Sequence, residues 1–228
     1  MQAFRVATVV PGALRHTRMA RGSRGWGWYL KHKQQGDDAF IRDRPPTPFD
    51  WDAAPAAPRK RAYVEIAIAG ENIGKVEFEL ASDLLPVTCK NFLQLCTGAA
   101  TGPDGAPLTY KGTPIHTLAK GVGLMGGDVE GGNGKKSHSG LGKRYFRDEG
   151  FFIPHSSEGL LTMANSGIDT NGSQFYVTIG PAPHMDGRSV AFGRVVGGMD
   201  VVRRVFGLFS VKAKPVSKVV ITDCDALP

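Results

Sequence analysis

Two consecutive runs, in which large apolar residues alternate with Glu or Ala, restrict the possible folds of this chain more than any other feature. They lie in the stretch AYVEIAIAGENIGKVEFEL, which begins at Ala62. Apolar side chains stand at every second position of both runs, namely Val64, Ile66, Ile68, Val76, Phe78 and Leu80. An alternation of period two predicts a strand with one buried face, and the Gly-Glu-Asn between the runs predicts a turn. The stretch therefore predicts a β-hairpin.

The chain after the hairpin is predicted to form short strands and two helices. Pro86 is expected to begin a helix that ends at Gly98. One face of this helix is expected to consist of Val87, Asn91, Phe92 and Leu95. A second helix is predicted over residues 199–206, and strands over residues 159–163, 174–179, 191–195 and 219–223. Many short strands between glycine turns, with two helices, predict a mainly β fold that closes into an antiparallel barrel.

The distribution of charge divides the chain into two parts. Residues 1–59 contain 10 Lys and Arg against 5 Asp and Glu, whereas residues 60–228 contain 18 against 16. The net charge of +7 therefore comes mostly from the first quarter, and the larger part is nearly neutral. We expect an N-terminal extension over residues 1–59, one domain over residues 60–228, and no direct nucleic-acid site.

Cysteine and histidine usage narrows the class further. The three cysteines, Cys89, Cys96 and Cys224, give an odd number and no metal-ligand spacing. They are expected to be buried free thiols in a reducing compartment. The six histidines do not cluster with acids or thiols, so we predict neither a metal nor a cofactor. No apolar run approaches the roughly 20 residues that span a bilayer, which predicts no transmembrane segment.

The first 36 residues have the composition of a targeting sequence. They contain seven basic residues, no acidic residue, and interspersed Ser, Thr and Ala. This pattern is typical of import into mitochondria. The alternative is a disordered basic arm on a cytoplasmic protein.

An aromatic segment begins within this stretch, at Trp26, and continues into a part rich in proline. Five prolines between Pro45 and Pro58 prevent continuous helix or sheet. Aromatic side chains are scarce in disordered linkers and enriched in surfaces that dock on partners. We therefore expect an extended, irregular arm that binds protein partners in a large complex through four aromatic residues: Trp26, Trp28, Tyr29 and Trp51.

The stretch FIPHSSEGLLTMANSGIDTNGSQFYVTIGPAPHMDGRSVAFGRVVGGMDVVRRV resembles the centre of a cyclophilin. The hairpin, the NFLQLCTG helix, the GGD at Gly126 to Asp128 and the final ITDC follow in the family's order. The resemblance covers about residues 61–228. It implies an eight-stranded antiparallel barrel capped by two helices, and an activity that isomerises peptidyl-prolyl bonds.

The resemblance also implies a peptide-binding site. Ala164 and Asn165 would offer backbone groups to an extended peptide, which could contain proline. Gln174 and Tyr176 would lie on the strand that follows, beside the proline pocket. The remaining pocket residues implied by the resemblance are Val122, Met125, His184 and Met185.

The catalytic positions depart from the family's pattern. Cyclophilins use an arginine in a Phe-His-Arg strand, steadied by a glutamine eight residues later. This chain reads IHTLAKGVGLMGGD, which puts Thr117 at the arginine's place and Met125 at the glutamine's. The pocket positions Val122 and Gly123 have also lost the bulk of an aromatic residue and a methionine. A threonine offers one hydroxyl where a guanidinium offers five donors, so we expect lost or very weak activity.

Two motifs invite other interpretations. GVGLMG over residues 121–126 matches G-x-G-x-x-G, but the polar GDVEGGNGKKSHSG after it is not expected to form the helix that a dinucleotide site needs. Lys135 and Lys136 are expected in a solvated loop. The loop over residues 97–112 is longer than in a compact cyclophilin and is a candidate second contact surface.

The sequence thus predicts a degenerate cyclophilin domain that serves as an accessory subunit of a large, mitochondrial assembly, such as a respiratory complex or mitochondrial ribosome. One alternative is a working isomerase that assists folding in the organelle, with Lys120 or His116 in the arginine's role. Another is a module that binds proline peptides without turnover.

Overall fold

The computed structural model of this chain describes residues 49–53, 55 and 57–228. Its elements in chain order are β1 Arg61–Ile68, β2 Glu71–Leu80, α2 Pro86–Thr97, β3 Ala100–Thr101, β4 Pro107–Leu108, β5 Thr117–Ala119, β6 Gly123–Gly126, β7 Leu160–Met163, β8 Phe175–Thr178, the 3₁₀ turn η1 Pro183–Met185, β9 Ala191–Gly197, α3 Met199–Phe206, β10 Ser210–Val211, β11 Lys214–Pro215 and β12 Val219–Leu227.

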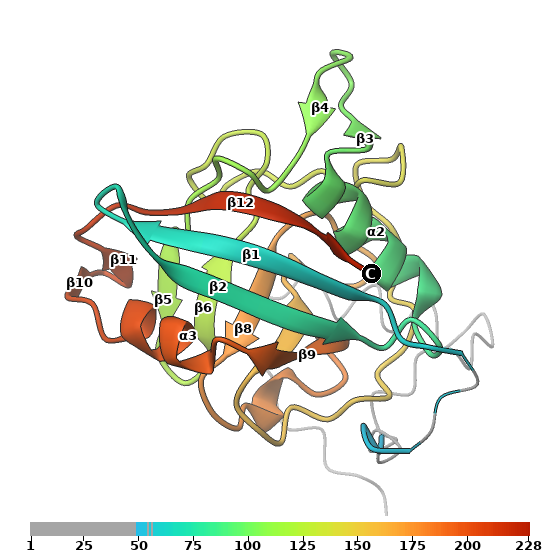
Figure 1. The fold of residues 1–228 in the computed structure, drawn as a ribbon. Coiled ribbons are helices and arrows are strands. Elements are labelled where there is room, and N and C mark those ends of the chain that lie inside the picture. The colour runs from blue at the N-terminus through green and yellow to red at the C-terminus, as the bar shows by residue number, and fades with distance from the viewer. Residues whose placement is uncertain (1–48, 54, 56) are drawn as a thin grey trace, which may run out of the picture. The chain divides into compact units, whose positions relative to one another are not determined.

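Eight strands form one curled antiparallel sheet in the order β12-β1-β2-β9-β7-β8-β6-β5 (Figure 1). The segment before β5 returns to the opposite edge, because Gly112 N donates to Ile221 O at 2.7 Å and Ile115 N donates to Val219 O at 3.1 Å. These bonds close the curl into a barrel. The predicted mainly β fold, with eight antiparallel strands and two α-helices, is confirmed for the described residues.

The β1–β2 hairpin follows the predicted alternation except at its turn. Ala69 and Gly70 both have positive φ, as a two-residue type I′ turn requires. The pairing slips by one residue between Ile66 and Ala67, which places a β-bulge next to the turn. As a result Ala67 is buried and Ile68 is only half-buried, so the expectation for Ile68 was wrong.

Both predicted α-helices are present. α2 begins at Pro86 and ends before Gly98, whose φ of 68° is the left-handed conformation that favours glycine at this position. The predicted face of α2 is correct for Asn91 and its apolar neighbours, but Val87 is 46% exposed. The reason is that Val87 lies in the first turn, where its N–H donates to Glu149 at the surface.

Phe92 of α2 fills the centre of the core. Its ring lies 5.8 Å from Phe78, 5.2 Å from Tyr110, 5.5 Å from Phe175 and 5.5 Å from Phe192, between ring centroids. Each ring comes from a different part of the barrel wall. Such tilted and edge-to-face contacts add to the stabilisation from burial, so Phe92 is the central contact between α2 and the barrel core.

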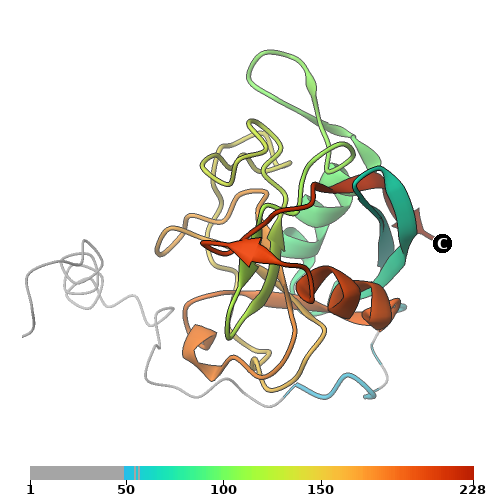
Figure 2. The ribbon, with the colours of Figure 1, turned by 90° about the vertical axis from the view of Figure 1, so that its left-hand side faces the viewer.

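Two small hairpins project from the barrel. β3 and β4 form one within the long loop over residues 97–112 (Figure 1). β10 and β11 form the other, and Figure 2 shows it beside the strands β5 and β6. The sequence analysis predicted neither hairpin, because each strand has two residues and carries no periodicity.

The described part of the N-terminal extension packs against the barrel. The ring of Trp51 lies edge-on to Phe49, 4.9 Å between centroids. The guanidinium groups of Arg59 and Arg194 lie 5.4 Å and 5.1 Å from the Trp51 ring. Trp51 therefore contacts its own domain, whereas Trp26, Trp28 and Tyr29 lie outside the described residues.

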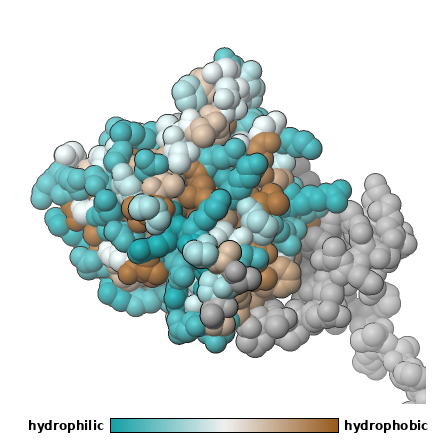
Figure 3. All heavy atoms as spheres, turned by 45° about the vertical axis from the view of Figure 1, so that its right-hand side comes forward, coloured by the Kyte–Doolittle hydropathy of each residue, from teal (hydrophilic) through white to brown (hydrophobic). Residues whose placement is uncertain are grey.

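The cysteines, the helices and the surface can be compared with the expectations from the sequence. Cys89, Cys96 and Cys224 are free and buried, as expected. No helix among the described residues is long and apolar enough to cross a membrane. On the face that Figure 3 shows, hydrophilic residues predominate and hydrophobic ones lie scattered between them.

Candidate peptide-binding site

Strand register brings the two altered catalytic positions together. Thr117 on β5 pairs with Met125 on β6, Met125 pairs with Tyr176 on β8, and Tyr176 pairs with Thr162 on β7. Directly paired residues of antiparallel strands project from the same face of a sheet. We call these four residues the outer row.

The outer row lies on the side of the sheet away from the barrel core. Its neighbours along the strands, Leu118, Leu124 and Val177, are buried in the core cluster. Thr117, Met125 and Tyr176 are half-buried instead. Since successive side chains of a strand point to opposite faces, Thr117, Met125 and Tyr176 face outward, where a peptide can reach them, whereas Thr162 is buried beneath His155.

The outer row has no charge at the position where catalysis needs one. The Thr117 hydroxyl lies 2.9 Å from Nδ1 of His116, and the Met125 side chain opposite it is uncharged. Burial lowers the pKa of His116, although the charge of Asp128 and the nearby Gln174 side chain oppose this effect. His116 therefore favours the neutral imidazole and is a poor replacement for a guanidinium.

Three of the predicted site residues form the peptide edge. Ala164 N donates to Gln174 O at 2.9 Å, and the Asn165 side-chain amide donates to Arg188 O at 2.7 Å. We call Ala164, Asn165 and Gln174 the peptide edge. The Gln174 side chain is 6% exposed, and its Nε2 donates to the carbonyls of Gly134 at 3.2 Å and Lys136 at 2.7 Å. The peptide edge is thus held on both sides by hydrogen bonds.

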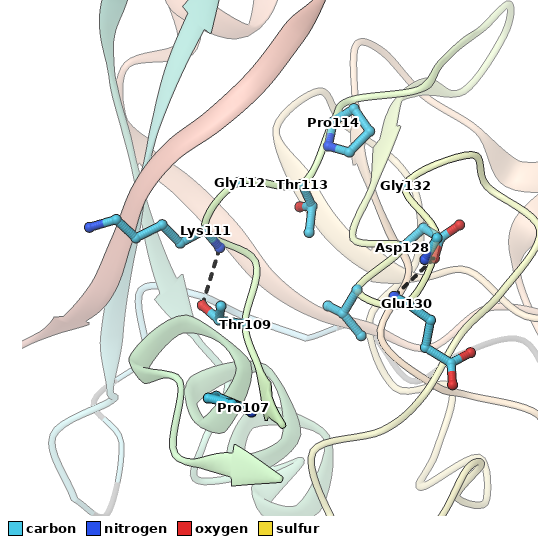
Figure 4. Close-up of a pocket in the computed structure, with 11 residues that line it drawn as sticks. Pro107, Thr109, Lys111, Gly112, Thr113, Pro114, Asp128, Glu130 and Gly132 are labelled. Atoms are coloured by element: carbon cyan, nitrogen blue, oxygen red, sulfur yellow. Dashed lines mark hydrogen bonds between the residues drawn. The ribbon is translucent and has the colours of Figure 1, made fainter. Parts of the chain in front are cut away.

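Asp128 shapes the loop that supplies these carbonyls. Its carboxylate accepts hydrogen bonds from five backbone N–H groups, those of Glu130, Gly131, Asn133, Gly134 and Lys136. Figure 4 shows Asp128 beside a hollow of about 380 Å³ between this loop and the segment of Lys111 and Pro114. Burial raises the pKa of Asp128, but the backbone donors together outweigh it and hold the pKa below its ordinary value.

The remaining predicted pocket residues lie on segments next to the outer row and the peptide edge. Val122 is in the β5–β6 turn, where Ile179 N donates to its carbonyl at 2.9 Å. Met185 on η1 is buried outside the core cluster, and its neighbour His184 is exposed. At Gly123, with φ 155°, an added Cβ would lie 1.9 Å from Val177 O. The backbone leaves no room for the methionine that the family places here.

A buried polar group links η1 to the outer row. His155 donates its backbone N–H to Asp186 at 2.8 Å, and its Nδ1 lies 2.8 Å from the same carboxylate oxygen. Its Nε2 lies 3.0 Å from the Thr162 hydroxyl. Burial lowers the pKa of His155, and the contact with Asp186 partly opposes the shift. This group fixes η1 against β7.

The geometry agrees with the rejection of a nucleotide site. The last four residues of GVGLMG form β6, and the loop of Asp128, not a helix, follows. Several N–H groups of that loop already donate to the Asp128 carboxylate, so they are not free to hold a phosphate. In the described ranges, no group of three or more His, Cys, Asp or Glu is placed to hold a metal.

The residues that support the site are not predicted by the sequence motifs. Asp128 is recognised there only as part of the GGD motif, and no motif gives His155 or Asp186 a role. The signal for Asp128 was the GGNG that follows it, because a carboxylate before a glycine-rich turn can accept several N–H groups. Nothing in the sequence linked His155 to Asp186, which is 31 residues away.

The closed barrel, the outer row and the peptide edge together define a cyclophilin-type protein. The family model for cyclophilin type peptidyl-prolyl cis-trans isomerases matches residues 63–226, and the chain belongs to this family. The resemblance inferred from the sequence is thereby confirmed.

Two relatives show how this domain occurs elsewhere. The NK-tumor recognition proteins of Mus musculus and Homo sapiens are each 42% identical to this chain over 175 residues. The matched region covers 75% of this chain but only 12% of each relative. The similarity therefore concerns the cyclophilin-type domain.

Proposed function

We propose that this protein is a cyclophilin-type domain whose isomerase activity is lost or very weak, and that it acts by binding other proteins. In this proposal it is an accessory subunit of a large mitochondrial assembly. The observation that carries the first part is the pairing of Thr117 with Met125 on the outer row.

The physical argument concerns the barrier to rotation. Rotating a prolyl amide breaks its resonance, and the barrier is about 18–20 kcal/mol. Lowering it requires preorganised donors that favour the twisted amide over both planar forms. Thr117 and Met125 provide no charged donor. The loss of one such donor in other enzymes costs about a hundred- to thousandfold in rate, and we expect a loss of at least this size.

Binding without turnover is compatible with the peptide edge. Gln174 remains fixed by two carbonyls, and Ala164 remains bonded to its backbone. Tyr176 still provides an aromatic wall. A shape that can hold an extended peptide therefore persists beside catalytic positions that have changed.

The mitochondrial and assembly parts of the proposal rest on the N-terminal extension. Its first 36 residues are basic without an acidic residue, and they include Trp26, Trp28 and Tyr29 near their end. Mass spectrometry of the native protein would read its mature N-terminus. Cleavage before Trp26, which leaves the three aromatic residues on the mature protein, is expected. Co-purification with a stable set of other subunits would support the assembly, and a protein found only as a monomer would contradict it.

Catalysis is tested by a coupled prolyl-isomerisation assay on the full chain, with an active cyclophilin as reference. We expect kcat/KM at least a hundredfold below the reference. A proline peptide titrated into the same sample should shift the amide signals of Tyr176 and Ala164. A rate close to the reference would overturn the loss of activity, and a silent titration would overturn peptide binding.

The second candidate is a weakly active isomerase that assists folding. Lys120, exposed in the turn after β5, favours it because this lysine is the cation nearest along the chain to Thr117. A flexible ammonium is a poor substitute for a planar guanidinium. If residual activity is found, Lys120→Ala should abolish it, whereas unchanged activity would exclude this lysine.

A further inference from the structure

The β10–β11 hairpin presents an apolar face to solvent. Ser210 pairs with Pro215, and Val211 pairs with Lys214. Val216 N donates to Phe209 O at 3.0 Å, which continues the same register by one pair. Because side chains alternate along each strand, one face of the hairpin carries four residues: Phe209, Val211, Lys214 and Val216.

These side chains are exposed to an unusual extent. Phe209 is 77% exposed, Val211 is 55% exposed and Val216 is 64% exposed. They are the three most exposed large hydrophobic residues of the described chain. A single exposed apolar residue needs no explanation, but several that share one face indicate an interaction surface.

The hairpin is held firmly against the barrel. Its turn, Lys212 and Ala213, has positive φ at both positions, as a tight two-residue turn requires. Leu118 N on β5 donates to Ala213 O at 2.7 Å. Figures 1 and 2 show the hairpin next to β5 from two directions. The apolar face is therefore a fixed surface, displayed beside the strand that carries Thr117.

A hollow extends this surface along the barrel. It measures about 400 Å³ and lies between Lys214–Val219 on one side and two short segments on the other. Those segments contribute Pro114, Ile115, His116, Gly132 and Asn133. The lining contains no acidic residue, and it joins the exposed face at Lys214 and Val216. Because Lys214 and Val216 belong to both, we call the hairpin face and the hollow together the groove.

The charged residues on the hairpin side of this groove are all basic. Residues 201–221 contain five basic residues and no acidic one. Of the five, Arg203 pairs with Glu158. Within the described part of the chain, Lys212, Lys214 and Lys218 form no ion pair, and all three are exposed. An occupant that matches the groove must therefore combine apolar side chains with negative charge.

We propose that the β10–β11 face and the adjoining hollow bind an extended, acidic and apolar segment of a partner protein. The apolar side chains would cover Phe209, Val211 and Val216, and the carboxylates would meet Lys212, Lys214 and Lys218. Burying the apolar face supplies most of the affinity, whereas charge complementarity supplies orientation and rate of association. The proposal holds whether or not the outer row retains catalysis.

The test uses the full chain and a synthetic peptide that alternates Glu or Asp with Phe or Leu over nine residues. A second peptide has Lys in place of every acid. NMR titration should shift the amides of residues 208–218 with the acidic peptide only, and leave Tyr176 unmoved. Raising the salt concentration should weaken binding. Shifts confined to other residues, or equal binding of the basic peptide, would overturn the proposal.

Matched variants separate apolar from charged contributions. Phe209→Ser/Val216→Ser should weaken binding of the acidic peptide at least tenfold, whereas Val87→Ser/Val196→Ser, at two other exposed sites, should not. Lys214→Glu/Lys218→Glu should weaken it similarly, against Lys90→Glu/Lys143→Glu as control. Equal effects of test and control pairs would contradict the site.

Vesicles with 30% anionic lipid and a single-stranded oligonucleotide are tested in parallel, and preferential binding of either one would overturn the choice of a protein partner.

Discussion

The peptide edge and the outer row lie side by side on the barrel but have changed to different extents. Gln174 on the peptide edge retains the residue that the family resemblance leads us to expect, with a hydrogen-bond partner on each side. Thr117 and Met125 on the outer row stand, by the same resemblance, at the two catalytic positions, and they pair directly across β5 and β6. The comparison teaches that catalysis rests on a few side chains pointing outward, whereas the edge rests on a hydrogen-bonded network that also holds the fold.

The most direct way to break this comparison is to restore the outer row. Thr117→Arg/Met125→Gln should raise kcat/KM about a hundred- to thousandfold, because the fork of donors returns to a barrel of unchanged shape. The coupled isomerisation assay measures the gain. Thr117→Lys is the matched control, and it should gain less because an ammonium is a point charge. A double variant as inactive as the wild type would show that the pocket, and not the missing donor, limits the rate.

A change at Asp128, which holds the loop beside the peptide edge, should lower both stability and peptide affinity. Asp128→Asn removes a charged acceptor of backbone N–H groups, and we expect a loss of about 3 kcal/mol in the free energy of unfolding. Urea unfolding measures this loss. Affinity for a proline peptide should fall as well, since Gln174 depends on the carbonyls of Gly134 and Lys136.

Asp104→Asn is the control for this experiment. Asp104 accepts one N–H, that of Ala106, in an exposed loop, and surface changes of this kind usually cost about 0.5 kcal/mol or less. If both variants lose the same stability, then Asp128 does not support the site as described.

Titration offers a smaller effect. Burial lowers the pKa of His155 and of His116 below the usual 6.5. Below pH 6.5 the unfolded chain therefore takes up protons that the folded chain does not. The free energy of unfolding should fall as pH decreases from 6.5 toward the lowered pKa values.

Chemical unfolding at a series of pH values measures this slope. His155→Gln should make the curve flatter between pH 5 and 6.5, because one of the two imidazoles with a lowered pKa is removed. The Asp128 carboxyl has a lowered pKa, so its stabilisation should disappear only at lower pH, as pH falls through that value. A slope that is unchanged in His155→Gln would contradict the assignment.

The smallest effect is expected outside both regions. Trp51→Ala removes two contacts between the indole ring and the guanidinium groups of Arg59 and Arg194, worth about 1–2 kcal/mol together. Thermal unfolding of the full chain measures the loss. Isomerisation and peptide binding should stay unchanged. An altered peptide affinity would show that the N-terminal extension communicates with the site.

Local sequence patterns were enough for much of the fold. The alternation in β1 and β2, and the Pro86 and Gly98 signals of α2, are properties of short segments. The β-bulge near Ile68 escaped prediction because it depends on how two strands pair. The hairpins β3–β4 and β10–β11 escaped because strands of two residues leave no repeat to detect.

For the site, the sequence by itself determined which chemical groups are present. It placed a threonine and a methionine where the family uses an arginine and a glutamine, and it fixed the glycine-rich loop after Asp128. The tertiary structure decided which of these groups meet. Thr117, Met125, Tyr176 and Thr162 share one face because strand register, set by long-range packing, aligns them.

Long-range packing also decides which apolar residues form the exposed hairpin face and which are buried in the core. Phe209, Val211 and Val216 are ordinary apolar residues in the sequence, and nothing there distinguishes them from core residues. Only pairing across β10–β11 and attachment to β5 place them on one exposed face beside three lysines. Residue type is a local property, whereas exposure and neighbourhood result from the packing of distant segments.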